Sequence, residues 1–181
     1  MPVLLFLITK SIIIDSVKKI LEVRFLSVEK VKNFFAALGE PEKVQEFAES
    51  TATSELAAQV LNCKLGQIAK TISVFVKKNP TLILMSGDMK LDNKKFKARF
   101  SCRPSMLKFE EVENLIGHAV GGVCPFAVNE GVKIYADESL KRYDFIYPAA
   151  GSSNSLVKLN LSELDKYIDI AGWVDVSKTK N

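Results

Sequence analysis

A glycine-rich stretch from Gly117 to Phe126 offers the first candidate chemistry, with the order Gly-His-Ala-Val-Gly-Gly-Val-Cys-Pro-Phe. The adjacent Gly121 and Gly122 let backbone N–H groups approach a ligand because no Cβ stands in the way. Pro125 restricts the turn that follows them. Such a loop can direct amide donors at a carbonyl or phosphate oxygen, which is the chemistry of an oxyanion hole. The alternative is a tight turn that only joins a helix to a strand.

A lysine, Lys70, stands near the start of an otherwise apolar strand, in the order Gly-Gln-Ile-Ala-Lys-Thr over residues 66–71. Lysine is rarely buried without a partner. We therefore expect the ammonium of Lys70 to emerge into a cleft or to meet an acid. A solvent-facing lysine on an alternating strand is the alternative.

Residues 149–155 form a third candidate region, with the order Ala-Ala-Gly-Ser-Ser-Asn-Ser. Small residues leave room for a ligand, and hydroxyl groups offer it hydrogen bonds. A plain connecting loop would have the same composition, so this region is informative only together with the other two.

His118 is the only histidine of the chain. Its ordinary pKa suits a general base, and the alternative is a polar wall of a pocket. Cys124 lies near it in sequence and suggests thiol catalysis, but no third orienting residue is visible. Packing as a small apolar side chain is the interpretation that we favour for Cys124.

A basic segment follows, in which one acidic residue, Asp92, opposes seven cations. It comprises Lys90, Lys94, Lys95, Lys97, Arg99, Arg103 and Lys108. A solvated helix face explains this run without a function. The functional alternative is contact with the phosphate backbone of a nucleic acid, led by Lys94, Lys95 and Arg99.

Helices and strands that could position these residues are expected from hydrophobic periodicity and capping residues. Helices are predicted over 28–38, 53–62, 92–100 and 109–116, and after Ser162. Strands are predicted over 68–76, 82–85, 132–136, 145–148, 156–159 and 173–176, with a turn at 77–80. Because the two kinds of element intermix without a regular βαβ rhythm, we expect an α+β fold: a mixed, largely antiparallel sheet surrounded by helices.

Length and composition indicate one globular domain, since the 181 residues are 48% hydrophobic and 25% charged. The net charge of +4 permits contact with phosphates without requiring it. Three widely spaced cysteines and one histidine argue against a disulfide framework and a metal centre. We therefore expect no metal, no cofactor and a cytoplasmic location.

The first 25 residues are unusual, because charges at Lys10, Asp15, Lys18 and Lys19 interrupt their apolar runs. These runs are too short to span a bilayer and lack the layout of a signal peptide. Three interpretations stay open: an additional strand and helix, a weak amphipathic anchor, or a start-site artefact with the native chain beginning near Leu26. We accordingly divide the chain into an extension, 1–25, and a domain, 26–181.

The order of the three candidate regions resembles the YbaK and prolyl-tRNA-synthetase editing-domain family, over about residues 28–176. Residues 53–58 are similar to the family's Thr-x-x-x-Ala-Ala helix, and Ile68–Ile72 to the segment with its lysine, here Lys70. Gly121 to Pro125 match its Gly-x-x-x-Pro loop, and Gly151 matches a glycine of its late loop.

The resemblance implies a YbaK-like single domain that hydrolyses the ester between a noncognate amino acid and the terminal adenosine of tRNA, without a metal. It implies catalytic roles for Lys70, Gly121 and Gly122. His118 joins them as a catalytic candidate from its residue type, since some family members carry other side chains at this position. The resemblance implies substrate contacts for a larger set: Thr71, Val123, Cys124, Pro125, Phe126, Gly151, Ser152 and Ser153.

The partners implied are the acceptor end of a tRNA, here a prolyl-type tRNA carrying a small amino acid, and an aminoacyl-tRNA synthetase, with no membrane partner. A binding or regulatory module that keeps the pocket without turnover is the competing hypothesis. The sequence leaves open which amino acid is removed, because one methylene changes binding by only about 1–3 kcal/mol.

Overall fold

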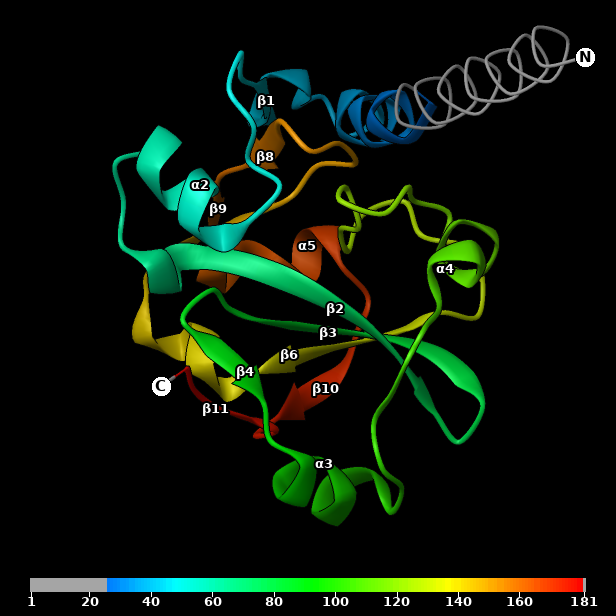
Figure 1. Cartoon of the computed structure of the whole chain (residues 1–181). Coiled ribbons are helices and arrows are strands. Elements are labelled where there is room, and N and C mark those ends of the chain that lie inside the picture. Colours follow the sequence, from blue (N-terminus) through cyan, green and yellow to red (C-terminus); the bar gives the residue numbers. More distant parts are fainter. Residues whose placement is uncertain (1–25, 181) are drawn as a thin grey trace, which may run out of the picture.

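A seven-stranded mixed sheet lies at the centre of the computed structural model, which describes residues 26–180 (Figure 1). Its strands follow the order β10-β6-β3-β2-β7-β9, and β5 pairs with β2. They are β2 (Ile68–Val76), β3 (Asn79–Ser86), β5 (Ser105–Met106), β6 (Lys133–Asp137), β7 (Phe145–Pro148), β9 (Leu159–Asn160) and β10 (Ile170–Val174).

Two short antiparallel pairs lie beside this sheet. One joins β1 (Val44–Glu46) to β8 (Ser155–Val157), and the other joins β4 (Met89–Leu91) to β11 (Ser177–Thr179). Within the described residues, five of the eight strand pairs are antiparallel and three are parallel. The expected mixed, largely antiparallel α+β architecture is therefore confirmed.

The hairpin of β2 and β3 turns over only two residues, Lys77 and Lys78, whose φ angles are 49° and 71°. Positive φ at both positions is what a tight hairpin turn requires. The predicted four-residue turn was too long, because Asn79 already pairs with Val76 and Pro80 with Phe75.

Strand β3 is buried on both faces and separates two apolar cores, as its unbroken apolar sequence requires. Leu82 and Leu84 belong to the larger core, whereas Ile83 and Met85 belong to the smaller one. The larger core includes side chains of the helical residues 26–37 and of α4 (Phe109–Ile116), and the smaller one includes those of α3 (Asn93–Phe100). In Figure 1 the helical residues 26–37 and α3 accordingly lie on opposite sides of the sheet.

Capping residues fix the helices near the site where the sequence predicted them. Thr53 caps α2 (Ser54–Val60) by accepting a hydrogen bond from the N–H of Leu56 at 3.2 Å. Asp92 caps α3 by accepting from the N–H groups of Lys94 and Lys95. Helix α4 ends at Gly117, whose φ of 90° terminates it.

Several predictions near the C-terminus were wrong in detail. The strand at 156–159 is two strands, β8 and β9, and the last sheet strand ends at Val174. The helix α5 (Leu164–Tyr167) has no side-chain cap from Ser162, which lies in a preceding 3₁₀ turn. The 3₁₀ helices are η1 (Pro41–Lys43), η2 (Leu65–Gln67), η3 (Glu138–Arg142) and η4 (Leu161–Glu163).

The proposed N-terminal extension, residues 1–25, lies outside the described residues. Across residues 26–180, no helix combines the length and the apolar character needed to cross a membrane.

Candidate functional site

Lys70 and the glycine-rich loop line the same cleft, which has a volume of about 560 Å³. Its walls come from residues 51–55 at the start of α2, residues 68–73 of β2, and Val120, Gly121 and Val123 of the loop. Ala149, Lys180 and the segment around Met106 complete it. We call this space the β2 cleft.

The ammonium of Lys70 lies at the β3–β4 turn. It donates to the carbonyl oxygen of Gly87 at 3.3 Å and to that of Met89. Burial, and then the nearby charge of Lys180, lowers the pKa of Lys70 to about 8. Lys70 is therefore a partly desolvated cation that lines the cleft, and it is mostly protonated at neutral pH.

Gly122 packs directly against the late loop. A Cβ on Gly122 would overlap the carbonyl group of Gly151, and a Cβ on Gly151, whose φ is 92°, would overlap the backbone of Ser27. The helical residues 26–37, the glycine-rich loop and the late loop thus contact one another without side chains between them. Gly122 and Gly151 therefore lie where two backbone segments approach each other closely.

The serines of the late loop bond to their own loop and to its neighbour. The hydroxyl of Ser152 donates at 2.8 Å to the amide oxygen of Asn154 and lies 2.7 Å from the hydroxyl of Ser155. The carbonyl of Ser153 accepts from the N–H of Thr51 at 2.7 Å. Thr51 lines the β2 cleft, whereas Ser152 and Ser153 do not. Ser153 therefore supports the cleft wall through its carbonyl, whereas the hydroxyl of Ser152 bonds within its own loop.

His118 is fully buried and does not line the β2 cleft. Its Nε2 lies 2.7 Å from the carbonyl oxygen of Phe126, which can only accept, so Nε2 donates. Its Nδ1 then accepts from the hydroxyl of Ser27 at 2.8 Å. Burial lowers the pKa of His118 to about 4. The structure therefore does not place His118 in the pocket where the general base was expected, and both of its ring nitrogens are bonded inside the protein.

Cys124 lies in the same enclosed cluster, with its Sγ 3.4 Å from Nε2 of His118. Burial raises the pKa of its thiol to about 12. The thiol is thus neutral at physiological pH, which agrees with its interpretation as a small packing residue. The side chain of Cys124 is completely buried and does not line the cleft in which a substrate contact was expected.

The remaining substrate-contact predictions divide into two groups. Thr71 and Val123 line the β2 cleft, and the buried hydroxyl of Thr71 has no hydrogen-bond partner within the described residues. Pro125 and Phe126 are buried, and the ring of Phe126 packs against Phe35 with centroids 5.0 Å apart. The structure does not place these two side chains in the cleft.

The mouth of the cleft contains groups that the sequence analysis did not identify. Met106 and Phe109 line it although 56% and 66% of their surfaces are exposed. Glu55 and Lys180 also line it and form an ion pair of 2.9 Å. The sequence does not predict that Phe109, an exposed aromatic residue at the start of a helix, lines the cleft. Its place there depends on the pairing of β5 with β2.

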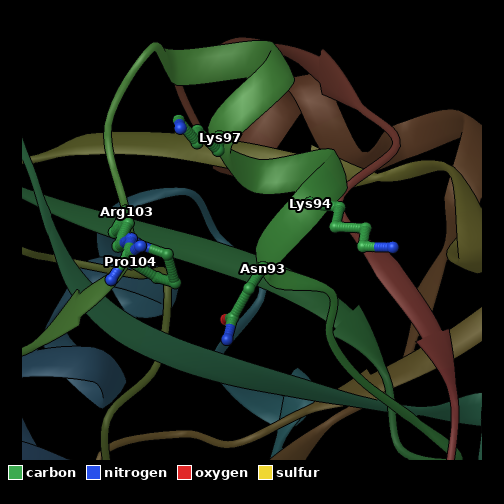
Figure 2. A pocket seen from close by; sticks show the side chains of 5 residues that line it. All are labelled: Asn93, Lys94, Lys97, Arg103 and Pro104. Carbon is green, nitrogen blue, oxygen red and sulfur yellow. The ribbon is translucent and has the colours of Figure 1, made fainter.

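The basic segment also forms a second, open pocket of about 350 Å³ (Figure 2). It is lined by Asn93, Lys94, Lys97, Arg103 and Pro104, and Figure 2 shows the Lys94 side chain extending away from Arg103.

The other two predicted tRNA contacts have partners within the protein. The ammonium of Lys95 pairs with Asp175 at 2.7 Å, and Arg99 lies over the rings of Phe100 and Tyr135. The structure thus separates Lys94 from Lys95 and Arg99, and groups it with Lys97 and Arg103.

Within residues 26–180, no three His, Cys, Asp or Glu side chains are grouped so that they could hold a metal ion.

Comparison with known proteins connects this site to a family. Residues 48–167 match the model of the aminoacyl-tRNA editing domain. The uncharacterized protein YwhH of Bacillus subtilis is 38% identical over 154 residues, which cover 84% of this chain and 98% of that protein.

Solved structures agree. A candidate trans-editing enzyme for prolyl tRNA synthetase is 30% identical with a TM-score of 0.75, covering 84% of this chain and 97% of that one. A structure from work on presenting linear epitopes on scaffold proteins is 28% identical with a TM-score of 0.76, covering 85% and 98%. The resemblance seen in the sequence is confirmed, and the chain belongs to the aminoacyl-tRNA editing domain family.

Proposed function

We propose that this protein is an aminoacyl-tRNA deacylase that acts in trans on a prolyl-type tRNA charged with a small noncognate amino acid. The observation that supports this most strongly is that Lys70 and the Gly121 loop line one cleft within an aminoacyl-tRNA editing domain. The similarity to a candidate trans-editing enzyme for prolyl tRNA synthetase supports the choice of tRNA.

The substrate is proposed to enter with its terminal nucleotide at the mouth of the cleft. The Lys70 cation would then attract the phosphate or ribose, and the unpartnered hydroxyl of Thr71 would bond to the bound ligand. The exposed ring of Phe109 offers a flat apolar face on which a nucleobase can stack.

The proposed reaction is attack of a water molecule on the ester carbonyl. The carbonyl oxygen gains negative charge, which backbone N–H groups of the loop at Gly121 would stabilise. The N–H of Gly122 is not among them, because it already donates to the carbonyl oxygen of Ala119 at 3.0 Å. The C–O bond to the ribose then breaks, the water's proton passes to the departing ribose oxygen, and a free amino acid remains. An aminoacyl ester is already activated, so positioning and charge stabilisation suffice without a metal or a cofactor.

A general base is not assigned to a protein side chain in this proposal. His118 is enclosed, with both ring nitrogens bonded, so it cannot reach a water in the cleft. A neighbouring hydroxyl of the substrate ribose can relay the proton instead. His118 is proposed to hold the glycine-rich loop against the helical residues 26–37.

The body of the tRNA is proposed to contact the pocket of Lys94, Lys97 and Arg103. Such contacts with phosphates are sensitive to salt and independent of base sequence. A tRNA substrate makes the cytoplasm the expected location, and it makes an aminoacyl-tRNA synthetase a further expected partner. Residues 26–181 are proposed to form the whole editing domain, and mass spectrometry of the native N-terminus tests whether residues 1–25 belong to it.

The proposal is tested by deacylation of a panel of tRNAs mischarged with cysteine, alanine, serine or threonine. Wild type should hydrolyse at least one of them, and Lys70→Ala should lose about 10²-fold or more of that rate, by analogy with loss of a charge-stabilising group. Lys133→Ala is the matched control, because this exposed lysine of β6 does not line the cleft. Binding of a mischarged tRNA without turnover would identify the competing non-catalytic module.

A further inference from the structure

The C-terminal segment lies alongside the turn that holds Lys70. Strand β11 pairs with β4 in the register Thr179↔Met89, and the N–H of Lys180 then donates to the carbonyl oxygen of Asp88 at 3.0 Å. Residues 87 and 89 supply the carbonyls that receive the Lys70 ammonium. The backbone of Lys180 is thereby fixed beside the Lys70 side chain.

The side chain of Lys180 extends into the β2 cleft, where it is one of the lining groups. Its ammonium lies 2.9 Å from a carboxylate oxygen of Glu55, at the start of α2. Lys180 is also close enough to Lys70 that its charge lowers the pKa of the Lys70 ammonium. Two ammonium groups and one carboxylate thus meet at this end of the cleft.

The local charge balance leaves one cation uncompensated. Asp88, the other acid near Lys70, is held by Arg142 in a bidentate pair of 2.6 and 3.0 Å. Glu55 can neutralise only one of the two ammonium groups. Two ammonium groups that lie close together and are partly desolvated favour the binding of an anion between them.

We propose that Lys180 is a second phosphate-binding residue of the cleft. Together with Lys70, it takes the phosphodiester on the 5′ side of the terminal adenosine, and it exchanges its Glu55 partner for that phosphate. This inference rests on the proposed function and names the part of the substrate that the C-terminal segment holds. Lys180 lies beyond residues 48–167, to which the family model extends.

The test compares two small ligands, adenosine and the dinucleoside phosphate CpA, which adds a cytidine and one phosphodiester. Binding of each to the full chain is measured by calorimetry over a range of salt concentrations. Lys180→Ala should weaken CpA binding by about five- to tenfold, as expected for one charge-assisted contact. It should reduce the salt slope by about one and leave adenosine binding within about twofold.

Three further variants sharpen the comparison. Lys180→Arg keeps the charge and should bind CpA almost as wild type does. Lys178→Ala removes a lysine of β11 that pairs with Asp92 at 3.2 Å and does not line the cleft, so CpA binding should not change. Glu55→Gln should tighten CpA binding by about twofold or more, because it removes the competing carboxylate; weaker binding would contradict the exchange of partners.

The possible results separate this inference from the proposed function. Equal losses for adenosine and CpA in Lys180→Ala would mean that Lys180 only holds the β3–β4 turn, and unchanged CpA binding would exclude a contact. Absence of CpA binding to wild type would overturn the inference as well. A Lys180-dependent affinity for CpA in a protein that deacylates no mischarged tRNA would support the phosphate site and refute the deacylase.

Discussion

Lys70 and His118 are both withdrawn from water, but their surroundings are of different kinds. The Lys70 ammonium bonds to two backbone carbonyls and still lines an open cleft. The imidazole of His118 is fully enclosed, between Ser27 and the carbonyl of Phe126. Burial lowers the pKa of both groups, to about 8 and about 4.

Access to the cleft, more than a shifted pKa, therefore distinguishes a candidate site residue such as Lys70 from a structural residue such as His118. A perturbed pKa is typical of active sites and also of buried polar networks. Lys70 keeps its charge at neutral pH and can meet a ligand. His118 is neutral there, and its bonds join the glycine-rich loop to the helical residues 26–37. The predictions below test this separation.

The largest effect is expected for Gly122→Ala, because the new Cβ would overlap the backbone of Gly151. The loop must shift, so its amides should lose their alignment and the deacylation rate should fall by about 10²–10³-fold. Stability should also fall, as judged by urea denaturation. Gly131→Ala is the control, because no atom lies within 4 Å of its new Cβ, and its φ of 83° adds a backbone strain that Gly122 does not have. A wild-type deacylation rate in Gly122→Ala would show that the glycine-rich loop does not take part in the reaction.

The pH dependence of stability should report His118. Its folded pKa of about 4 lies below the ordinary value of 6.5, so between these pH values the unfolded chain binds a proton that the folded protein does not. The contribution of His118 to the free energy of unfolding should therefore be constant above about pH 6.5 and fall by up to about 3 kcal/mol as the pH drops to 4. His118→Gln should lack this component in denaturation curves. An identical pH profile for the two proteins would show that folding does not shift the pKa of His118.

A smaller effect is expected at the mouth of the cleft. Phe109→Ala should weaken tRNA binding by about tenfold, because it removes one stacking surface, and should leave stability within about 0.5 kcal/mol because the ring is exposed. Phe109→Tyr should restore binding. Leu38→Ala removes another exposed apolar side chain away from the cleft and serves as the control. Equal affinities of Phe109→Ala and wild type would exclude stacking on this ring.

The smallest effect is expected from the basic pocket. The double variant Lys94→Glu, Lys97→Glu should reduce tRNA affinity by about threefold at moderate salt and reduce its salt dependence. Hydrolysis of a small aminoacyl ester should not change, because the pocket is separate from the β2 cleft. Filter binding at several salt concentrations measures the first quantity. A fall in small-ester hydrolysis would mean that this surface affects the cleft itself.

Local signals in the sequence predicted much of this fold. Caps at Thr53 and Asp92 and the glycine at 117 placed three helices correctly, and β-branched residues placed β2 over its full length. The motif order predicted that Lys70 and the Gly121 loop belong together. These features depend on residues that are neighbours along the chain.

The features that were missed depend on contacts between distant residues. The enclosure of His118 requires Ser27, which is 91 positions away. The position of Lys180 follows from the pairing of two three-residue strands, β4 and β11, and neither strand carries a pattern that identifies its partner. The same holds for Lys95, whose acidic partner Asp175 is 80 positions away.

The most direct test of the cleft as the reacting site compares Lys70→Met with His118→Gln, by single-turnover deacylation of one mischarged tRNA together with denaturation curves. Lys70→Met should lose about 10²-fold or more in deacylation rate, because the cation in the cleft is removed. It should keep its stability, because the charge that is removed is partly desolvated in the folded protein. His118→Gln should lose about 2 kcal/mol of stability and, per folded molecule, keep its rate within about threefold. The reverse pattern, a fully active Lys70→Met and a folded but inactive His118→Gln, would contradict this account.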